Sequence, residues 1–371
     1  DIVGWNFFDN NNDPTDLSSY FQAGDHGSGR ASDAVERGNN AQGSIGVCPH
    51  CQFTPVRVWD TFVSDGNTFG LGMVYATDNG AKVIEGADGN LYHSAFTEAA
   101  SSYAYAHGVV QTYSGDDLNT GDHNYPGNYS HAMLIQGTVP DSIGLGSSYS
   151  IPSPPSGTPA PIASELNTIR DQFLSLQNQA GAAGFGSDIP PTTYFRGANT
   201  TQFGGHSSVA LEGTTGSQNT GQASGAAALV ISAAQEHGLV LTPDETRAIL
   251  EQTAERATTP NGGALGSPDL MAPATCVGPI TPSSSQGACA TSDLQWTSHF
   301  GWGRVDLGAA VAVAASGKIP PIAAIDSPDW YAPLTGNSVD ITGLARASHA
   351  TGGSLRWKLM WAPGVQPASN A

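Results

Sequence analysis

Basic residues are scarce in this sequence. Lys and Arg number 13 against 32 Asp and Glu in 371 residues, so the formal net charge is -19 at pH 7, and the isoelectric point is near 4.6. A nucleic-acid backbone attracts cationic surfaces, so this balance argues against nucleic acid as a partner. The excess of negative charge instead favours a soluble protein, because the negatively charged surfaces of separate molecules repel each other.

Long apolar runs are also missing. No stretch approaches the ~20 consecutive apolar residues that a membrane-spanning helix needs, so no membrane span is expected. Charged residues make up 12% of the chain and hydrophobic residues 39%, which is a globular composition rather than that of a coiled coil or a disordered tail. The first residues, "DIVGWNFF", contain neither an initiator methionine nor a signal peptide, which indicates a processed product or a fragment.

Cysteine is rare, and its positions are informative. The four cysteines form two close pairs, Cys48/Cys51 in "CPHC" and Cys276/Cys289, which bracket a loop rich in Pro and Ser. This spacing fits two local disulfides in an oxidising compartment and hence an extracellular or cell-surface location, although spacing alone does not fix the connectivity. Two alternatives stay open: a redox-active motif at "CPHC" and a zinc site of four cysteines.

Strand-like and helix-like segments alternate along the first 320 residues. The pattern predicts strands at 53–60, 81–87, 108–115 and 131–138, and helices at 68–79, 95–107 and 222–237. Such alternation is typical of an α/β sheet with crossover helices. A further helix should begin in "TPDETRAILEQTAE", where Thr242 can cap the helix, Pro243 occupies the first turn and Glu245 completes a capping box.

The domain organisation follows from changes in this pattern. We expect one α/β domain over residues 1–320, with an insertion at about 140–192 that includes a stretch rich in Ser, Pro and Gly. After Pro320 and Pro321, the runs "SVDITG" and "SLRWKLMW" alternate in a way that predicts strands with one buried face. Residues 321–371 are therefore interpreted as the start of an Ig-like β-sandwich domain, too short to be complete.

One serine precedes an alanine-rich apolar run in "TGSQNTGQASGAAALV". Ser217 has two interpretations: it caps a helix, for which serine is a common choice, or it is a nucleophile at the start of that helix. Gly216 allows a close approach to the serine, and the amide N–H groups of the first helical turn would point at the attacking oxygen.

Several stretches, in chain order, resemble motifs of the subtilisin-like serine peptidases, the subtilase family. The segment "DHGSGRASDAV" is similar to the HGTHVAG motif, the segment around Ser217 to GTSMAxPHVAGAAALV, and "HFGWGRVDLGAAV" to the closing FGYGRVD motif. The resemblance covers roughly residues 1–320 and implies a mostly parallel sheet with helices on both faces. It also implies His26 as general base, Ser217 as nucleophile, a polypeptide substrate cleaved through an acyl-enzyme, and no required cofactor.

The chain departs from the family pattern at three places. The aspartate of the family's triad lies on a strand upstream of the first residue here, so we expect an upstream segment or a second chain to supply it; otherwise the chain is an inactive structural or binding scaffold. Asp116 stands at the oxyanion position in place of asparagine and could donate a hydrogen bond only when protonated. The substrate-lining segment consists of Gly86, Ala87, Asp88 and Gly89.

A polar loop near the N-terminus offers ligands for a hard cation. Asp9, Asn11, Asp13 and Asp16 supply the oxygen atoms that calcium prefers. Several subtilases bind calcium in the corresponding loop, so the resemblance supports a calcium site. The alternative is a solvated turn.

Overall fold

The structure, a computed structural model, describes the following residues: 4–15, 26–59, 65–90, 92–115, 124–139, 160, 196–197, 206–213, 216–255, 257–258, 272–273, 296, 300–328, 332, 334–349 and 354–359. Several predictions fall outside these residues. They concern Asp16, Asp116, the pair Cys276 and Cys289, and nearly all of the insertion at about 140–192.

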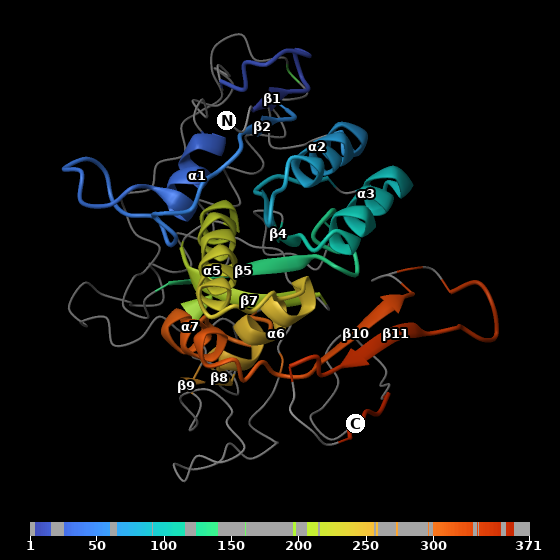
Figure 1. The fold of residues 1–371 in the computed structure, drawn as a ribbon. Coiled ribbons are helices and arrows are strands. Elements are labelled where there is room, and N and C mark those ends of the chain that lie inside the picture. The colour runs from blue at the N-terminus through green and yellow to red at the C-terminus, as the bar shows by residue number, and fades with distance from the viewer. Residues whose placement is uncertain are drawn as a thin grey trace, which may run out of the picture.

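A mostly parallel sheet forms the centre of the fold (Figure 1). Its four parallel strands follow the order β3 (Val83–Gly86), β4 (Val110–Ser114), β5 (Met133–Val139) and β7 (Ser207–Glu212). The short β6 (Arg196–Gly197) pairs antiparallel with β5. The predicted strands that correspond to β3, β4 and β5 are confirmed.

Two strands stand apart from this sheet. β1 (Trp5–Asn6) pairs with β2 (Val56–Arg57) in a parallel sheet of their own, and no ladder joins β2 to β3 among the described residues. β2 is shorter than the predicted strand at 53–60.

Helices cover both faces of the sheet, as predicted. They are α1 (His26–Val35), α2 (Gly66–Asp78), α3 (Ala95–Ala106), α5 (Gly216–Glu236), α6 (Pro243–Thr253) and α7 (Leu307–Ser316). On one face, Ile84 and Tyr113 pack with Met73 in the layer of α2 and α3. On the other face, Val83 packs against the alanine-rich side of α5, because successive strand residues point to opposite faces. Figure 1 shows this arrangement, with α1 beside α5 and with α2 and α3 across the sheet.

Glycines let α1 and α5 approach closely. A Cβ atom on Gly221 would lie 2.6 Å from the Arg30 carbonyl oxygen, and one on Gly225 would lie 2.7 Å from the Ala34 carbonyl oxygen. Arg30 and Ala34 are four residues apart, as are Gly221 and Gly225, so the two helices run in the same direction. The contact therefore repeats once per turn along both helices.

The predicted capping box at the start of α6 is confirmed. The Glu245 Oε2 atom accepts from the Thr242 backbone N–H at 2.9 Å, and the Thr242 hydroxyl accepts from the Glu245 N–H at 3.3 Å. The second carboxyl oxygen of Glu245 lies 3.0 Å from His349 Nδ1. Glu245 is buried, so this contact fixes the segment of His349 against the helix.

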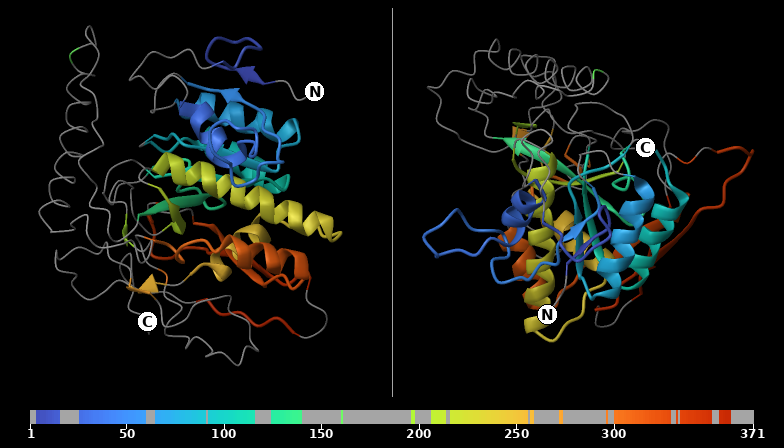
Figure 2. Two further views of the ribbon diagram at one scale, coloured as in Figure 1. Left: turned by 90° about the vertical axis from the view of Figure 1, so that its left-hand side faces the viewer. Right: turned by 90° about the horizontal axis from the view of Figure 1, so that it is seen from above.

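His349 follows a two-stranded hairpin. Antiparallel β10 (Ile322–Ser327) and β11 (Thr342–Arg346) lie on the opposite side of the molecule from α1 in Figure 1, and the right-hand view of Figure 2 agrees. The predicted strand at 338–343 overlaps only the start of β11, and residues 354–359, also predicted as a strand, have no regular secondary structure. Because one hairpin does not define a sandwich, the Ig-like domain over 321–371 stays a prediction.

A separate pair of short antiparallel strands consists of β8 (Ala257–Thr258) and β9 (Ala272–Pro273).

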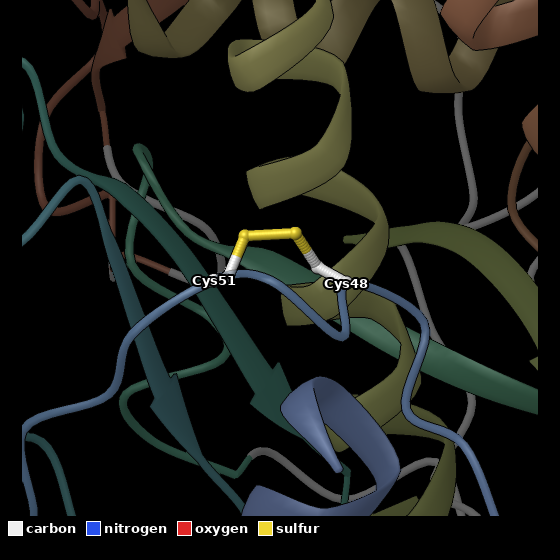
Figure 3. The surroundings of a disulfide bond; sticks show 2 residues. All are labelled: Cys48 and Cys51. Carbon is white, nitrogen blue, oxygen red and sulfur yellow. A yellow bond between two sulfur atoms is a disulfide. The ribbon is translucent and has the colours of Figure 1, made fainter. Parts of the chain in front are cut away.

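The predicted bond between Cys48 and Cys51 is confirmed (Figure 3). It lies in the loop after α1, where the Cys48 N–H donates to the Ala34 carbonyl at 2.8 Å. The bridge therefore closes a short turn directly beside the contact between α1 and α5. None of the helices in the described ranges is long and apolar enough to cross a bilayer.

The close contact at Gly225 predicts a large effect of one methyl group. Replacing Gly225 by Ala should lower the free energy of unfolding by about 1–3 kcal/mol, because the new Cβ would overlap the Ala34 carbonyl and the Val47 side chain. The same replacement at Gly29 of α1 is the control, since a Cβ there meets nothing within 4 Å. Urea unfolding of both variants measures the difference, and equal stabilities would contradict this account of the packing.

Candidate active site

Ser217 lies where a strand gives way to a helix. β7 ends at Glu212 and α5 begins at Gly216, so Ser217 occupies the first turn of a 21-residue helix at the carboxyl end of the sheet. The residue is 5% exposed, and its Oγ atom donates to the Ala87 carbonyl oxygen at 3.3 Å. The structure thus brings the predicted nucleophile together with one of the predicted substrate-lining residues.

His26 is the first residue of α1. α1 and α5 approach closely at Arg30 and Gly221, and the helices run in the same direction. His26 precedes Arg30 by four residues, and Ser217 precedes Gly221 by four residues. One turn back along both helices, the backbone positions of His26 and Ser217 therefore lie at a similar level, at the N-terminal end that the two helices share.

The other predicted substrate-lining residues face different surroundings. A Cβ on Gly86 would meet the rings of Phe69 and Tyr113 at 2.6–2.9 Å, so Gly86 faces the core under α2 and α3. Asp88 is half-buried, and burial raises the pKa of its carboxyl to about 7. Gly89 packs directly against the side chain of Asn124.

β3 contains an acidic group that the sequence motifs did not identify. Glu85 of β3 is half-buried, and its Oε1 atom is fully buried with no hydrogen-bond partner in the described part of the chain. Burial raises the pKa of Glu85 to about 8; the charges of Asp88 and Asp33 add to the shift, whereas Arg30 of α1 opposes it. At neutral pH this carboxyl is therefore largely protonated. The available signal was an acidic residue inside a segment predicted to be a buried strand.

In the loop proposed for calcium, the carboxylates of Asp9 and Asp13 accept hydrogen bonds from other groups of the protein. Asp9 Oδ2 accepts from Arg57 Nη1 at 2.8 Å and from Asn6 Nδ2 at 3.0 Å. Asp13 Oδ1 accepts from the Thr15 backbone N–H at 3.1 Å, and hydrogen bonds from Thr15 lower the pKa of Asp13. Asn11 Oδ1 accepts from the Asp13 N–H at 2.8 Å.

Within the described ranges, no cluster of three or more His, Cys, Asp or Glu side chains is arranged to hold a metal ion. Asp16 and Asp116 lie outside those ranges. Calcium binding and the oxyanion role of Asp116 therefore stay predictions.

A serine at a strand-to-helix junction, with a histidine at the start of the neighbouring helix, is an arrangement that suits a nucleophilic hydrolase. The model of the Subtilase family matches residues 2–303, so the chain belongs to this family. The resemblance inferred from the motifs is thereby confirmed, and with it the subtilisin-like α/β fold.

Curated relatives resemble part of the chain. Thermitase of Thermoactinomyces vulgaris is 34% identical over 139 residues, which cover 37% of this chain and 47% of thermitase. A thermophilic serine proteinase of Bacillus sp. (strain AK1) is 30% identical over 135 residues, which cover 36% of this chain and 32% of that protein. The matched part of the chain thus spans less than half the length of either relative.

Among solved structures, one neighbour is fervidolysin from Fervidobacterium pennivorans, described as a keratinolytic enzyme related to subtilisin. The structural alignment covers 80% of this chain and 36% of the fervidolysin chain. The sequence identity is 18% and the TM-score is 0.46.

The buried carboxyl of Glu85 predicts a pH-dependent stability. Its pKa is higher in the folded chain than the ordinary value of 4.5, so the folded state binds this proton more tightly than the unfolded state. The contribution of this protonated carboxyl to the free energy of unfolding is fully present below about pH 4.5, and it is lost as the pH rises toward about 8. Glu85→Gln, which resembles the protonated acid, should leave the melting temperature unchanged at pH 4 and raise it by about 3 °C or more at pH 9.

The control for this experiment is Glu236→Gln, at the exposed end of α5. It should shift the melting temperature equally at both pH values. Differential scanning calorimetry measures all three proteins, and a Glu85→Gln effect that does not grow with pH would show that the carboxyl ionises normally.

Proposed function

We propose that the chain is the larger part of an extracellular serine endopeptidase that hydrolyses peptide bonds through an acyl-enzyme on Ser217. The observation that carries the proposal is the pairing of helix ends: Ser217 lies in the first turn of α5, and His26 begins the parallel helix α1. Family membership and the names of the two curated relatives support the reaction class. The disulfide between Cys48 and Cys51 supports an oxidising location.

In the proposed reaction, Ser217 Oγ attacks the carbonyl carbon of the scissile peptide bond while His26 accepts the hydroxyl proton. The C–N bond then breaks, and His26 returns the proton to the leaving amine. A water molecule, deprotonated by His26, then attacks the acyl carbon; the bond to Ser217 Oγ breaks, His26 returns the proton to Oγ, and the acid is released. The N-terminal end of α5 stabilises the negative charge that develops next to Ser217.

The proposal includes a further extended segment that carries a carboxylate to His26. The space for it is suggested by the break between β2 and β3, whose facing edges are unpaired among the described residues. Helix α2 spans this break, because Gly72 approaches Val56 and Val58 on the β2 side, while Met73 packs with Ile84 of β3. An added strand would satisfy both edges, and an upstream segment or a second chain could provide it.

Labelling by an active-site probe tests the proposal. A fluorophosphonate should modify Ser217 in the chain, expressed with any residues that its gene encodes upstream of Asp1, and Ser217→Ala should abolish the signal. His26→Ala should reduce the labelling rate by at least about a hundredfold, because the base is lost. Peptide mapping by mass spectrometry identifies the modified residue. If Ser217 is unlabelled between about pH 4 and 10, the alternative of a non-catalytic scaffold holds instead.

The substitution at the oxyanion position gives a separate prediction. Asp116 can donate a hydrogen bond to the developing oxyanion only while protonated, whereas His26 can act as a base only while neutral. Asp116→Asn removes the first requirement, so labelling at pH 9 should become at least about tenfold faster than in the parent. Identical pH profiles of the two proteins would exclude an oxyanion role for Asp116.

A further inference from the structure

The helix that begins with His26 is anchored mainly near its other end. Of the ten residues of α1, Ala34 is the one that is buried. Ala34 contacts α5 at Gly225, where an added Cβ would lie 2.7 Å from the Ala34 carbonyl oxygen. A helix of this length is marginal without tertiary contacts. The placement of His26 therefore depends on what holds the last turn of α1.

The loop after α1 completes this anchor. The Cys48 N–H donates to the Ala34 carbonyl at 2.8 Å, and the preceding Val47 N–H donates to the Asp33 carbonyl at 3.1 Å. Both carbonyls lie in the last turn of α1, where a helix has no internal donors for them. An added Cβ on Gly225 would also lie 2.8 Å from the Val47 Cβ, so Val47 packs against α5 beside Ala34.

The disulfide between Cys48 and Cys51 fixes this loop. The bond closes a turn in which the Cys51 N–H donates to the Cys48 carbonyl at 2.9 Å, and the bridge lies beside α5 (Figure 3). Cys48 is 3% exposed, whereas Cys51 is partly exposed. A thiol or disulfide in solution therefore has access to the bridge from the side of Cys51.

We propose that Cys48 and Cys51 form a redox-controlled modification site, at which oxidation by an external disulfide fixes α1 on α5 and thereby activates the chain. The Cys51 thiolate attacks the external disulfide, which gives a mixed disulfide and releases one thiolate. The Cys48 thiolate then attacks Cys51 Sγ, so the bridge forms and the second thiolate leaves. Two electrons pass to the external disulfide, and the two protons lost by the cysteines are taken up by the released thiols.

The reduced chain would keep its sheet but hold His26 less firmly, so activity would arise only in an oxidising location. The control of activity rests on the proposed function, because it concerns the pair of His26 and Ser217. The effect on α1 does not, since it is measurable without catalysis.

Hydrogen exchange measured by mass spectrometry tests the effect on α1. The full chain carrying Cys276→Ser and Cys289→Ser is compared before and after reduction by dithiothreitol, so that Cys48 and Cys51 alone respond. Backbone amides of α1 should exchange at least about tenfold faster in the reduced form, because their anchor is loosened. Amides of α3 should be unchanged, and glutathione disulfide should restore the slow exchange of α1.

The matched control is the variant with Cys48→Ala and Cys51→Ala, in which every other residue is retained. Its α1 should exchange as in the reduced form and should respond to neither reagent. Equal exchange of α1 in the two redox forms would overturn the proposal, because the bridge would have no effect on the helix. Equal loosening of α1 and α3 would also overturn it, because the bridge would then stabilise the whole chain.

Fluorophosphonate labelling of the same samples tests the control of activity. Ser217 should be labelled at least about tenfold more slowly after reduction, because a small displacement of the base slows the reaction strongly, and reoxidation should restore the rate. Equal labelling rates in the two redox forms would overturn the proposal. If α1 responds as expected but neither form is labelled, the proposed catalytic function is refuted, and the redox site on α1 stands.

Discussion

The close packing of α1 on α5 determines the geometry of the candidate site. Each helix carries one of the two proposed reacting residues at its start, and neither residue is held to the other by a covalent link or a shared loop. Their relative position depends on the contacts one and two turns further along, at Gly221 and Gly225. Side chains at these positions would separate the helix axes and, with them, the two helix ends.

The fold was largely predictable from the sequence, because its strands are buried and its helices have clear end signals. The strands β3, β4 and β5 are short apolar runs, and α6 begins with a complete capping box. Ser217 was correctly expected near the start of this helix, but the range predicted for its alanine-rich part, 222–237, begins six residues after α5 does, since the first turn consists of Gly and polar residues. Their burial against α1 and the sheet stabilises helix where intrinsic propensity is weak. The hairpin and residues 354–359 differ from the predicted strands, because alternation of apolar residues does not reveal the pairing partner.

The candidate site was predictable only where its residues form sequence motifs. His26 and Ser217 are identified by the segments around them, and the contact between Ser217 and Ala87 agrees with the expected substrate-lining segment. Glu85 was not identified, since the burial of its carboxyl and the shift of its pKa arise from contacts between distant parts of the chain. The charges of Arg30 and Asp33 in α1 contribute to the pKa of Glu85, although these residues lie far from it in the sequence. Spacing along one segment contains no information about such contacts.

The two carboxyl oxygens of Glu245 contact different parts of the chain. One caps the first turn of α6, and the other binds His349 beyond the hairpin. A single side chain therefore connects the folding of a helix in the α/β domain with the attachment of the segment that follows that domain. A force applied to the chain beyond the hairpin would be transmitted to the first turn of α6 through Glu245. Proteolytic loss of the hairpin together with His349 would leave a buried carboxyl oxygen of Glu245 without its partner. The boundary between the two parts of the chain is thus a point of mechanical coupling rather than a free hinge.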